Sequence, residues 1–480
     1  MSGLVRTSDV NLPIRIAEST MASAPNAARI AEFETWYADC AARNPTTVTP
    51  VPLAELSDWS FAPDTGNLGH TSGKFFQIEG LDVRQPGARI PQWTQPIINQ
   101  PEIGILGILI KEIDGELHCL MQAKVEPGNC NGIQLSPTVQ ATRSNYTRVH
   151  KGRPVPYLEY FTDTAAHRVI SDVLQSEQGS WFYQKRNRNM VVEVRGDVVV
   201  LPDFHWMPLN LVHRFLAFEN MVNMDARTVL SCLPFSGKDL MALLPTGGTE
   251  LRMALLRSCS EESGSQYTTD AILSWITDTR TRVETTATRI PLAAVEQWVR
   301  SPTAISHETG LYFSIIGVDV AAAGREVRQW SQPMLSPAGD SLAAFLVKRI
   351  DGVLHVLANA RLEPGYLDAV ELAPTVQCTV LNYADLPTAD RPPFLDEVLS
   401  ADLARIRFDA THSEEGGRFY HARTRYLIVE TDDELGPRDY PDHRWLTLNQ
   451  LVGLLRHSHY VNVQARSLVA CLHSLVGRAG

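Results

Sequence analysis

One predicted strand, residues 116–126, carries several side chains that can do acid–base chemistry. Alternate residues of a strand share a face, so His118, Gln122, Lys124 and Glu126 lie together, with apolar residues on the opposite face. Imidazole and carboxyl groups transfer protons near neutral pH, and an ammonium group stabilises a developing oxyanion. The alternative is that this polar face simply meets solvent, as in many antiparallel sheets.

A second copy of this strand occurs later in the chain. Residues 113–146 and 350–383 align without a gap, since 350 − 113 and 383 − 146 both give 237. The copy places polar residues at the same register: His355, Asn359, Arg361 and Glu363. The chain is therefore a duplication, and the recurrence favours a ligand-facing role for both faces in two versions of one pocket. The solvent-facing alternative stays open.

Each strand ends in a Glu-Pro-Gly turn, at residues 126–128 and 363–365. Proline fixes φ and glycine accepts a positive φ, so both residues favour a turn. A carboxylate at a strand end is well placed to act as a general base, although capping the turn is its commoner role.

A row of hydrogen-bonding side chains follows the first turn: Asn129, Asn131, Gln134, Ser136, Thr138, Gln140, Arg143, Asn145 and Tyr146. Such a row is typical of a site for a sugar or a nucleobase. The alternative is a loop whose side chains bond to their own backbone.

Basic clusters stand out in an otherwise acidic chain. The first half holds Arg143, Arg148, Lys151 and Arg153, then Lys185, Arg186 and Arg188, and the second half keeps Arg418, Arg423 and Arg425. Arginine holds a diphosphate through paired hydrogen bonds, so these clusters are candidates for that role. Solvated loops are the alternative.

Aromatic residues with polar neighbours also recur in both halves. They are Trp93 with Gln95, Trp330 with Gln332, and the pairs Phe182-Tyr183 and Phe419-Tyr420. An exposed tryptophan in each copy could stack on a pyrimidine base. Packing in the core is the alternative, and we prefer it for Phe182 and Phe419.

Hydrophobic periodicity predicts the elements that position these residues. Residues 28–43 show helical spacing, and strand patterns follow over 74–83, 103–113 and 116–126. Asp114-Gly115, repeated as Asp351-Gly352, predicts a tight hairpin. Two helices close each half, so each half reads as a mixed sheet with flanking helices, and the fold class is α+β.

The repeat also predicts a division of the chain. We expect a loose N-terminal arm (1–25), a first repeat (26–235), a linker (236–266) and a second repeat (267–480). Two repeats are too few for a solenoid, so two packed, pseudo-symmetric domains are the expected architecture.

Composition excludes several classes of function. The 480-residue chain has a net charge of −11, which argues against general affinity for nucleic acid or acidic membranes. Seven scattered cysteines without a CxxC pair predict a reducing, cytoplasmic location, and no apolar run is long enough to span a membrane. GxGxxG, GxxxxGK[ST], HExxH and GxSxG motifs do not occur, which removes the usual dinucleotide, P-loop, zinc-protease and serine-hydrolase interpretations.

Four repeated blocks, W-[TS]-Q-P, EPG, [SA]-P-T-V-Q and SEQGSWF/SEEGGRF, resemble the NDP-hexose 2,3-dehydratase family of deoxysugar biosynthesis. The resemblance covers residues 26–478, duplication included. It implies halves similar to the Nudix hydrolase fold, a homodimer, and dTDP-4-keto-6-deoxy-D-glucose as substrate. It further implies a place in antibiotic biosynthesis, with a downstream NDP-sugar 3-ketoreductase as the next enzyme.

The chemistry implied by this resemblance is an elimination. A base takes the C3 proton, an enolate forms on the C4 ketone, and the C2 hydroxyl leaves with a proton from an acid. The product is a 3,4-diketo-2,6-dideoxy sugar. No redox cofactor is required, because the ketone itself is the electron sink. The helix-borne carboxylates of a Nudix box are missing after Glu126 and Glu363, so we expect no metal site and no metal-dependent pyrophosphate hydrolysis.

Within this resemblance, Glu126 or His118 is the expected base or acid, Lys124 the enolate or diphosphate partner, and Tyr183 an alternative proton donor. The other expected substrate-binding residues of the first copy are Trp93, Gln95, Gln122, Asn129, Asn131, Ser136, Thr138, Gln140, Arg143, Asn145, Tyr146, Lys151, Trp181, Lys185, Arg186 and Arg188. The second pocket is expected to comprise Trp330, Gln332, Asn359, Arg361, Glu363, Thr375, Gln377, Asn382, Arg418, Tyr420, Arg423 and Arg425.

The first copy is the expected active pocket, because it has more cations and the fuller amide row. The second is expected to be vestigial or auxiliary. Two alternatives remain from the sequence: a non-catalytic nucleotide-sugar-binding protein, for which two pockets would suffice, and a residual Nudix hydrolase.

Overall fold

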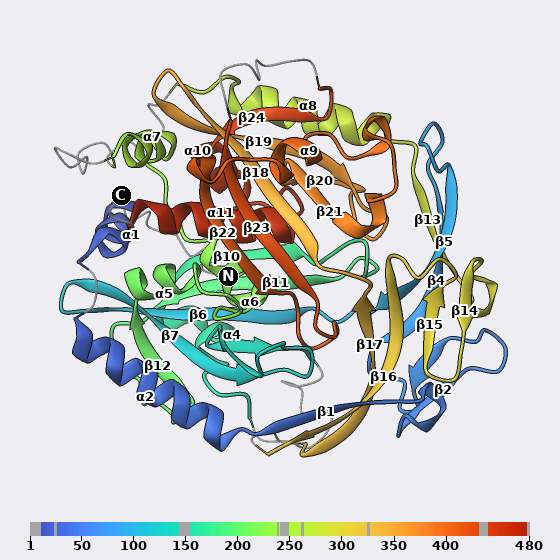
Figure 1. Cartoon of the computed structure of the whole chain (residues 1–480). Helices are drawn as coiled ribbons and strands as arrows, with labels where there is room; N and C mark the ends of the chain where they lie inside the picture. Colours follow the sequence, from blue (N-terminus) through green and yellow to red (C-terminus); the bar gives the residue numbers. More distant parts are fainter. Residues whose placement is uncertain are drawn as a thin grey trace.

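The computed structural model describes residues 11–23, 26–143, 154–237, 240, 249–260, 264–323, 327–431 and 440–477. Its strands form two seven-stranded and two five-stranded sheets within these ranges. In Figure 1 the two larger sheets lie one above the other, helices α6 and α11 lie between them, and the smaller sheets stand to one side.

The first half contains, in chain order, α1 (Leu12–Met21), α2 (Ala27–Arg43), β1 (Thr46–Val51), β2 (Trp59–Phe61), β3 (Leu68–His70), β4 (Gln77–Arg84), β5 (Gln92–Asn99), β6 (Gly104–Ile113), β7 (Glu116–Val125), β8 (Ile133–Ser136), β9 (Val139–Ala141), α4 (Glu159–Thr162), β10 (Arg168–Ser176), β11 (Arg186–Glu193), β12 (Phe204–Pro208), α5 (Leu209–Phe215) and α6 (Met224–Leu230).

The second half repeats this order with α7 (Glu250–Ser258), α8 (Thr269–Arg282), β13 (Thr286–Ile290), β14 (Trp298–Arg300), β15 (Ala304–His307), β16 (Phe313–Ala322), β17 (Gln329–Pro337), β18 (Ser341–Ile350), β19 (Val353–Leu362), β20 (Val370–Ala373), β21 (Val376–Thr379), α9 (Leu395–Leu399), β22 (Ile406–Ser413), β23 (Arg423–Glu430), β24 (His443–Thr447), α10 (Leu448–Leu454) and α11 (Val463–Val476).

Each large sheet is mixed, as the sequence predicts. In the first half the order is β10-β11-β6-β7-β12, where β11 runs parallel to β6 and the other neighbours are antiparallel. The predicted hairpin between β6 and β7 is confirmed. Both turn residues have a positive φ, 53° at Asp114 and 82° at Gly115, and Asp351 and Gly352 repeat them at 50° and 76°.

The two halves exchange their first strands. Strand β1 of the first half pairs with β16 of the second, and β13 of the second half pairs with β4 of the first. The five-stranded sheets are therefore shared (Figure 1). The boundaries expected at residues 26–235 and 267–480 mark the repeat in the sequence rather than two separately packed bodies.

A single apolar core also joins the halves. It contains Met121 and Val191 from the first large sheet, Phe345 and Val347 from the second, and the facing sides of α6 and α11. Two fully buried arginines cross this boundary. Arg227 donates to the backbone oxygen of Ser413 (3.1 Å), and Arg466 donates to that of Ser176 (2.6 Å).

The expected loose arm and linker each contain a packed helix. Within residues 1–25, α1 buries Ile16 and Ala17 completely against the common core. Within residues 236–266, α7 buries Leu255 and Leu256 in the same way. Both helices are short, so their apolar pattern spans too few turns to stand out in the sequence.

Candidate active site

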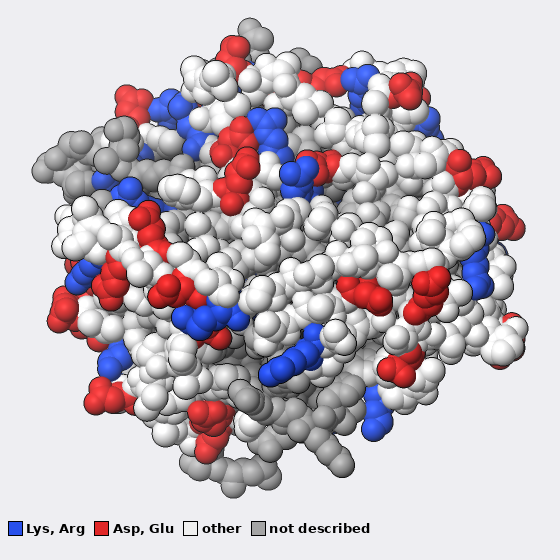
Figure 2. Space-filling model, turned by 60° about the horizontal axis from the view of Figure 1, so that its bottom comes forward, with Lys and Arg blue, Asp and Glu red and all other residues white. Residues whose placement is uncertain are grey.

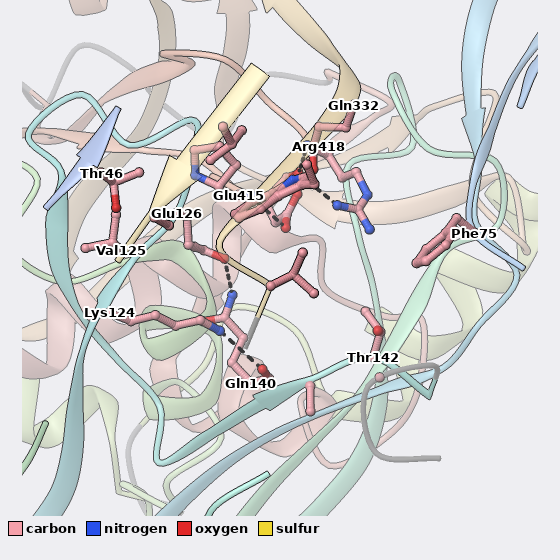
Figure 3. A pocket seen from close by; sticks show the side chains of 18 of the residues that line it. Thr46, Phe75, Lys124, Val125, Glu126, Gln140, Thr142, Gln332, Glu415 and Arg418 are labelled. Atoms are coloured by element: carbon pink, nitrogen blue, oxygen red, sulfur yellow. Dashed lines mark hydrogen bonds between the residues drawn. The ribbon is translucent and has the colours of Figure 1, made fainter. Parts of the chain in front are cut away.

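A cavity of about 1870 Å³ opens over the end of β7, and both halves line it. The first half contributes Gln122, Lys124 and Glu126 from the strand that the sequence singles out, and the second contributes residues of β16, β17 and the loop 413–418. Figure 3 shows Glu126 and Lys124 next to Gln140, with Glu415, Arg418 and Gln332 reaching the same space from the second half. The site is composite.

Gln140 holds the two residues expected to do chemistry. Its Nε2 donates to Glu126 Oε1 at 2.7 Å, and its backbone oxygen accepts from Lys124 Nζ at 3.2 Å (Figure 3). Glu126 is only 6 % exposed. A carboxyl group and an ammonium group therefore lie near one another at one strand end, and the carboxyl group has little contact with bulk water.

Four of the carboxyl groups that line the cavity form a carboxyl cluster: Glu126, Glu177, Asp225 and Glu415. Burial raises the pKa of Glu177 and of Asp225. Burial also raises the pKa of Glu415 to about 7, against the charge of Arg418 and with repulsion from Glu126 and Glu177. Burial thus favours the protonated form of these three groups, which makes them candidates for a proton donor.

Cations balance part of this cluster. Lys124, Lys185 and Arg418 line the same cavity. Burial lowers the pKa of Lys185 to about 8, although the Glu177 carboxylate opposes the change. Lys185 Nζ donates to the backbone oxygen of Glu102, which fixes its position at the cavity wall.

The Glu-Pro-Gly turn brings Glu126 to the second half. The backbone N–H of Gly128 donates to the oxygen of Gly416 at 2.7 Å, and a Cβ at Gly128 would collide with the backbone oxygen of Phe419. The other copy repeats this docking, with Gly365 donating to Gly179 at 2.7 Å. Each turn therefore requires glycine because it meets the backbone of the opposite half.

Part of the predicted set lies together at this cavity. Its members are Gln122, Lys124, Glu126, Thr138, Gln140 and Lys185. Three residues assigned from the sequence to a second pocket, Trp330, Gln332 and Arg418, line this first cavity instead. Their sequence-based assignment does not match this placement, because β17 and the loop 413–418 of the second half reach the cavity of the first half.

The structure places His118 and Tyr183 outside the residues that line the cavity. His118 is buried further along β7, where Nδ1 lies 3.0 Å from the oxygen of Glu116 and burial lowers its pKa. Tyr183 packs with Leu81, Val83 and Ile97. Their placement gives no support to a role in proton transfer, and the chemistry proposed below does not use them.

Other predicted residues of the first copy also lie away from the cavity. Three of them, Asn129, Asn131 and Ser136, donate to backbone oxygens of nearby loops. Trp93 donates to Gln95, Gln95 donates to the backbone oxygen of Ser180, and Trp181 packs on Phe419. Arg188 forms an ion pair with Asp172, Arg186 lies on β11, and Arg143 is exposed. Asn145, Tyr146 and Lys151 lie outside the described residues.

The residues of the predicted second pocket bond to one another and to nearby backbone. Glu363 accepts from Arg361 Nε at 3.0 Å, from Gln377 Nε2 at 2.9 Å and from the backbone N–H of Ser180 at 3.1 Å. The remaining residues also have partners within the protein. Asn359 lies on β19 between β20 and β24, Thr375 donates to the backbone oxygen of Leu357, and Asn382 accepts from the backbone N–H of Tyr312. Tyr420 packs against the same apolar cluster as Trp330, Arg423 forms an ion pair with Asp340, and Arg425 forms one with Asp409.

The sequence analysis missed Glu177, Asp225 and Glu415. A signal for two of them exists in the repeat: Glu415 stands where the other copy has Gln178 (415 − 178 = 237), and Asp225 where it has Gln464 (464 − 225 = 239). A charged residue that replaces an amide within a shared block marks a difference between two otherwise similar sites.

Two negative findings apply to the described ranges only. They hold no group of three or more His, Cys, Asp or Glu side chains arranged for a metal ion. None of their helices is long and apolar enough to cross a membrane.

On the face drawn in Figure 2, acidic and basic side chains are scattered singly and in small groups.

Fold and site together define a duplicated α+β protein with one acid–base cavity built by both halves. A family model described as NDP-hexose 2,3-dehydratase matches residues 30–233 and again residues 269–472. The chain belongs to the NDP-hexose 2,3-dehydratase family, as its repeated blocks predict.

Full-length relatives agree. The chain is 51% identical over 461 residues to a dTDP-4-dehydro-6-deoxy-alpha-D-glucopyranose 2,3-dehydratase of Saccharopolyspora spinosa, covering 96% of this chain and 95% of that protein. Proteins of the same name from Amycolatopsis orientalis (47% over 465 residues; 96% and 93% covered) and Streptomyces violaceoruber (49% over 449 residues; 93% and 97% covered) are similar to it over almost their whole length.

Proposed function

We propose that this protein removes water across C2 and C3 of dTDP-4-dehydro-6-deoxy-D-glucose, the substrate that the names of its relatives contain. The observation that carries the proposal is the Glu126, Lys124 and Gln140 arrangement at the end of β7. It offers a base and a cation within one cavity, which are the two groups that proton removal beside a ketone requires.

Glu126 acts as the base at C3. The C3 hydrogen is acidic because the C4 ketone accepts the electron pair as an enolate. The Gln140 amide fixes the Glu126 carboxylate at 2.7 Å, so the group is held in one orientation before substrate binds. The ammonium group of Lys124 stabilises the negative charge that develops on the C4 oxygen.

The rest of the cavity accepts the nucleotide. At about 1870 Å³ it is much larger than a hexose requires. Arg418 is the lining arginine next to the carboxyl cluster and suits a diphosphate oxygen, whereas Trp330 and Phe75 offer aromatic faces for the base. The sugar then lies at the deep end, against Glu126.

The test is direct turnover of the proposed substrate. Purified protein incubated with dTDP-4-dehydro-6-deoxy-D-glucose that carries deuterium at C3 is expected to release the label to solvent and to yield a dTDP-sugar lighter by one water. Capture of the product by a thiol or by an added ketoreductase keeps it measurable. The variant Glu126→Gln is the matched control and is expected to do neither.

The same experiment separates the alternatives. A nucleotide-sugar-binding protein leaves the labelled sugar unchanged while it retains dTDP in a binding assay. A residual Nudix hydrolase releases dTMP in a magnesium-dependent reaction. Either result in place of water loss contradicts the proposal.

Further parts of the proposal rest on the family resemblance. They are the hydro-lyase reaction class, a cytoplasmic location, a homodimer, no cofactor, a role in antibiotic deoxysugar biosynthesis, a downstream NDP-sugar 3-ketoreductase and the Nudix-like character of each half. Light scattering of the purified protein tests the homodimer: a monomer mass at micromolar concentration contradicts it.

A further inference from the structure

The duplication places two carboxyl groups together where the other copy has a carboxyl group and an amide. In that copy Gln178 Nε2 donates to Glu414 Oε2 at 2.8 Å across the boundary between the halves. The equivalents at the active cavity are Glu415 for Gln178 and Glu177 for Glu414, at the offset of 237. An amide always has an N–H to donate, whereas a carboxyl group donates only when it is protonated.

The surroundings of Glu415 indicate a protonated group. Its Oε1 accepts from the backbone N–H of Gly417 at 3.2 Å, and its Oε2 is buried without a hydrogen-bond partner among the described residues. Glu126 and Glu177 are close enough to repel a second negative charge, while Arg418 and Lys185 oppose them. The balance of burial and charge raises the pKa of Glu415 to about 7.

The neighbouring Glu126 has a different hydrogen-bond environment. It accepts a 2.7 Å hydrogen bond from the Gln140 amide, an interaction that a carboxylate oxygen can make. Both groups line the same cavity and reach it from different halves of the chain (Figure 3). One member of the pair is thus set up to take a proton and the other to give one.

We propose that Glu415 is the catalytic acid that protonates the departing C2 hydroxyl group, with Glu126 as the base at C3; this deepens the proposed function and rests on it. Glu126 takes the C3 proton, and the C3–H electron pair forms the enolate. The enolate then forms the C2–C3 double bond as the C2–O bond breaks, and the proton of Glu415 joins the leaving hydroxide to give water. Glu126 ends protonated and Glu415 ionised, so one proton transfer between them, directly or through water, restores both.

The roles have separable kinetic signatures. The variant Glu415→Gln is expected to lower kcat for water loss by about 10²- to 10⁴-fold, the usual contribution of a general acid. Glu126 is intact in this variant, so C3 deuterium still washes out to solvent. In Glu126→Gln both washout and water loss are expected to stop. A residue that only supports the fold would reduce both processes together.

The pH profile gives a second readout. An acid whose pKa is about 7 is protonated below that pH, so wild-type kcat/KM is expected to fall as the pH rises through about 7. In Glu415→Gln the residual rate is expected to lose this fall. Glu415→Asp, which keeps a carboxyl group one carbon further back, is expected to keep the fall at a reduced rate.

Glu414→Gln is the matched control. Glu414 is the adjacent buried carboxyl group, bonded to Gln178 and Tyr426 on the side of the other copy, and its loss is expected to leave kcat within a few-fold. Water loss at the wild-type rate in Glu415→Gln overturns the inference. So does a Glu415→Gln protein that has the stability of the wild type but loses both the release of C3 deuterium to solvent and the loss of water. If Glu415→Gln does not fold, Glu415→Asp decides by the same two readouts. Failure of the wild-type protein to lose water overturns the proposed function itself.

Discussion

The cavity at Glu126 and its pseudo-symmetric counterpart at Glu363 share one backbone scaffold, but they give the carboxyl group different partners. At the cavity, Lys124 donates to the backbone oxygen of Gln140, and the Gln140 amide donates to the Glu126 carboxyl group. At the counterpart, Arg361 pairs directly with Glu363 at 3.0 Å. The guanidinium, the Gln377 amide and the backbone N–H of Ser180 together occupy both oxygens of that carboxyl group.

Other exchanges reinforce this contrast. The cations Lys185 and Arg418 correspond to Ala422 and Trp181 in the other copy, and the carboxyl groups Asp225 and Glu415 correspond to Gln464 and Gln178. Each exchange removes a charge from the counterpart. Asn129 corresponds to Tyr366, which is 4 % exposed. The two copies therefore differ mainly in charge, on backbones that follow the same order of elements.

The counterpart nevertheless contributes to the active cavity. Its half supplies Glu415 and Arg418, and its Gly416 and Phe419 receive the turn that carries Glu126. The exchange of β1 and β13 ties the halves together further. Neither half builds the cavity alone, because residues of both halves line it.

A large effect, second only to loss of the Glu126 or Glu415 carboxyl group, is expected from the cation of each copy. Lys124→Met is expected to lower kcat by about 10²- to 10³-fold, because it removes the group that faces the developing oxyanion. Arg361→Met is expected to leave kcat per folded molecule unchanged and to lower the free energy of unfolding by about 3–5 kcal/mol, because it leaves Glu363 buried without its ion partner. Steady-state kinetics and urea unfolding of both variants measure these effects, and the reverse pattern would contradict the contrast.

A smaller effect is expected where each turn meets the opposite half. Gly128→Ala and Gly365→Ala both place a Cβ against backbone atoms and are expected to lower the free energy of unfolding by about 3 kcal/mol. Only Gly128→Ala is also expected to reduce kcat in the folded protein, because it displaces Glu126. Gly453→Ala on α10, which meets no atom within 4 Å, is the control. Equal loss of kcat in both turn variants would count against a single active cavity.

The smallest effect concerns the pH dependence of stability. The pKa of Lys185 is lowered to about 8 in the folded protein, below its unfolded value, so between about pH 8 and 10 the unfolded chain binds more protons. Stability contributed by this group therefore rises with pH over that window. Lys185→Met is expected to remove this rise, whereas Lys111→Met, outside the cavity, keeps it. An identical pH dependence in wild type and Lys185→Met would show that Lys185 is not desolvated.

Local patterns in the sequence predict part of this account. Asp114-Gly115 gives the hairpin because both residues tolerate a positive φ, and the alternation along β7 puts Lys124 and Glu126 on one face. These features depend on neighbours in the chain. The amides Asn129 and Asn131 mislead, because the same side chains serve equally well to bond loop backbone.

Contacts between distant segments account for what the sequence does not predict. Pairing of β1 with β16 has no local signature, since any exposed strand edge can pair with either copy. Glu415 and Arg418 belong to the second repeat in the sequence, yet they line the first cavity because the two halves interlock. Only a residue-by-residue comparison of the copies could have pointed to Glu415 and Asp225.

The central claim is that one composite cavity, and not its counterpart, performs the elimination. The most direct measurement is kcat for water loss from dTDP-4-dehydro-6-deoxy-D-glucose in Glu126→Gln and Glu363→Gln, compared at equal folded concentration. The account predicts a loss of about 10²- to 10⁴-fold in Glu126→Gln and a rate within a few-fold of wild type in Glu363→Gln. Retained turnover in Glu126→Gln with loss in Glu363→Gln would contradict it.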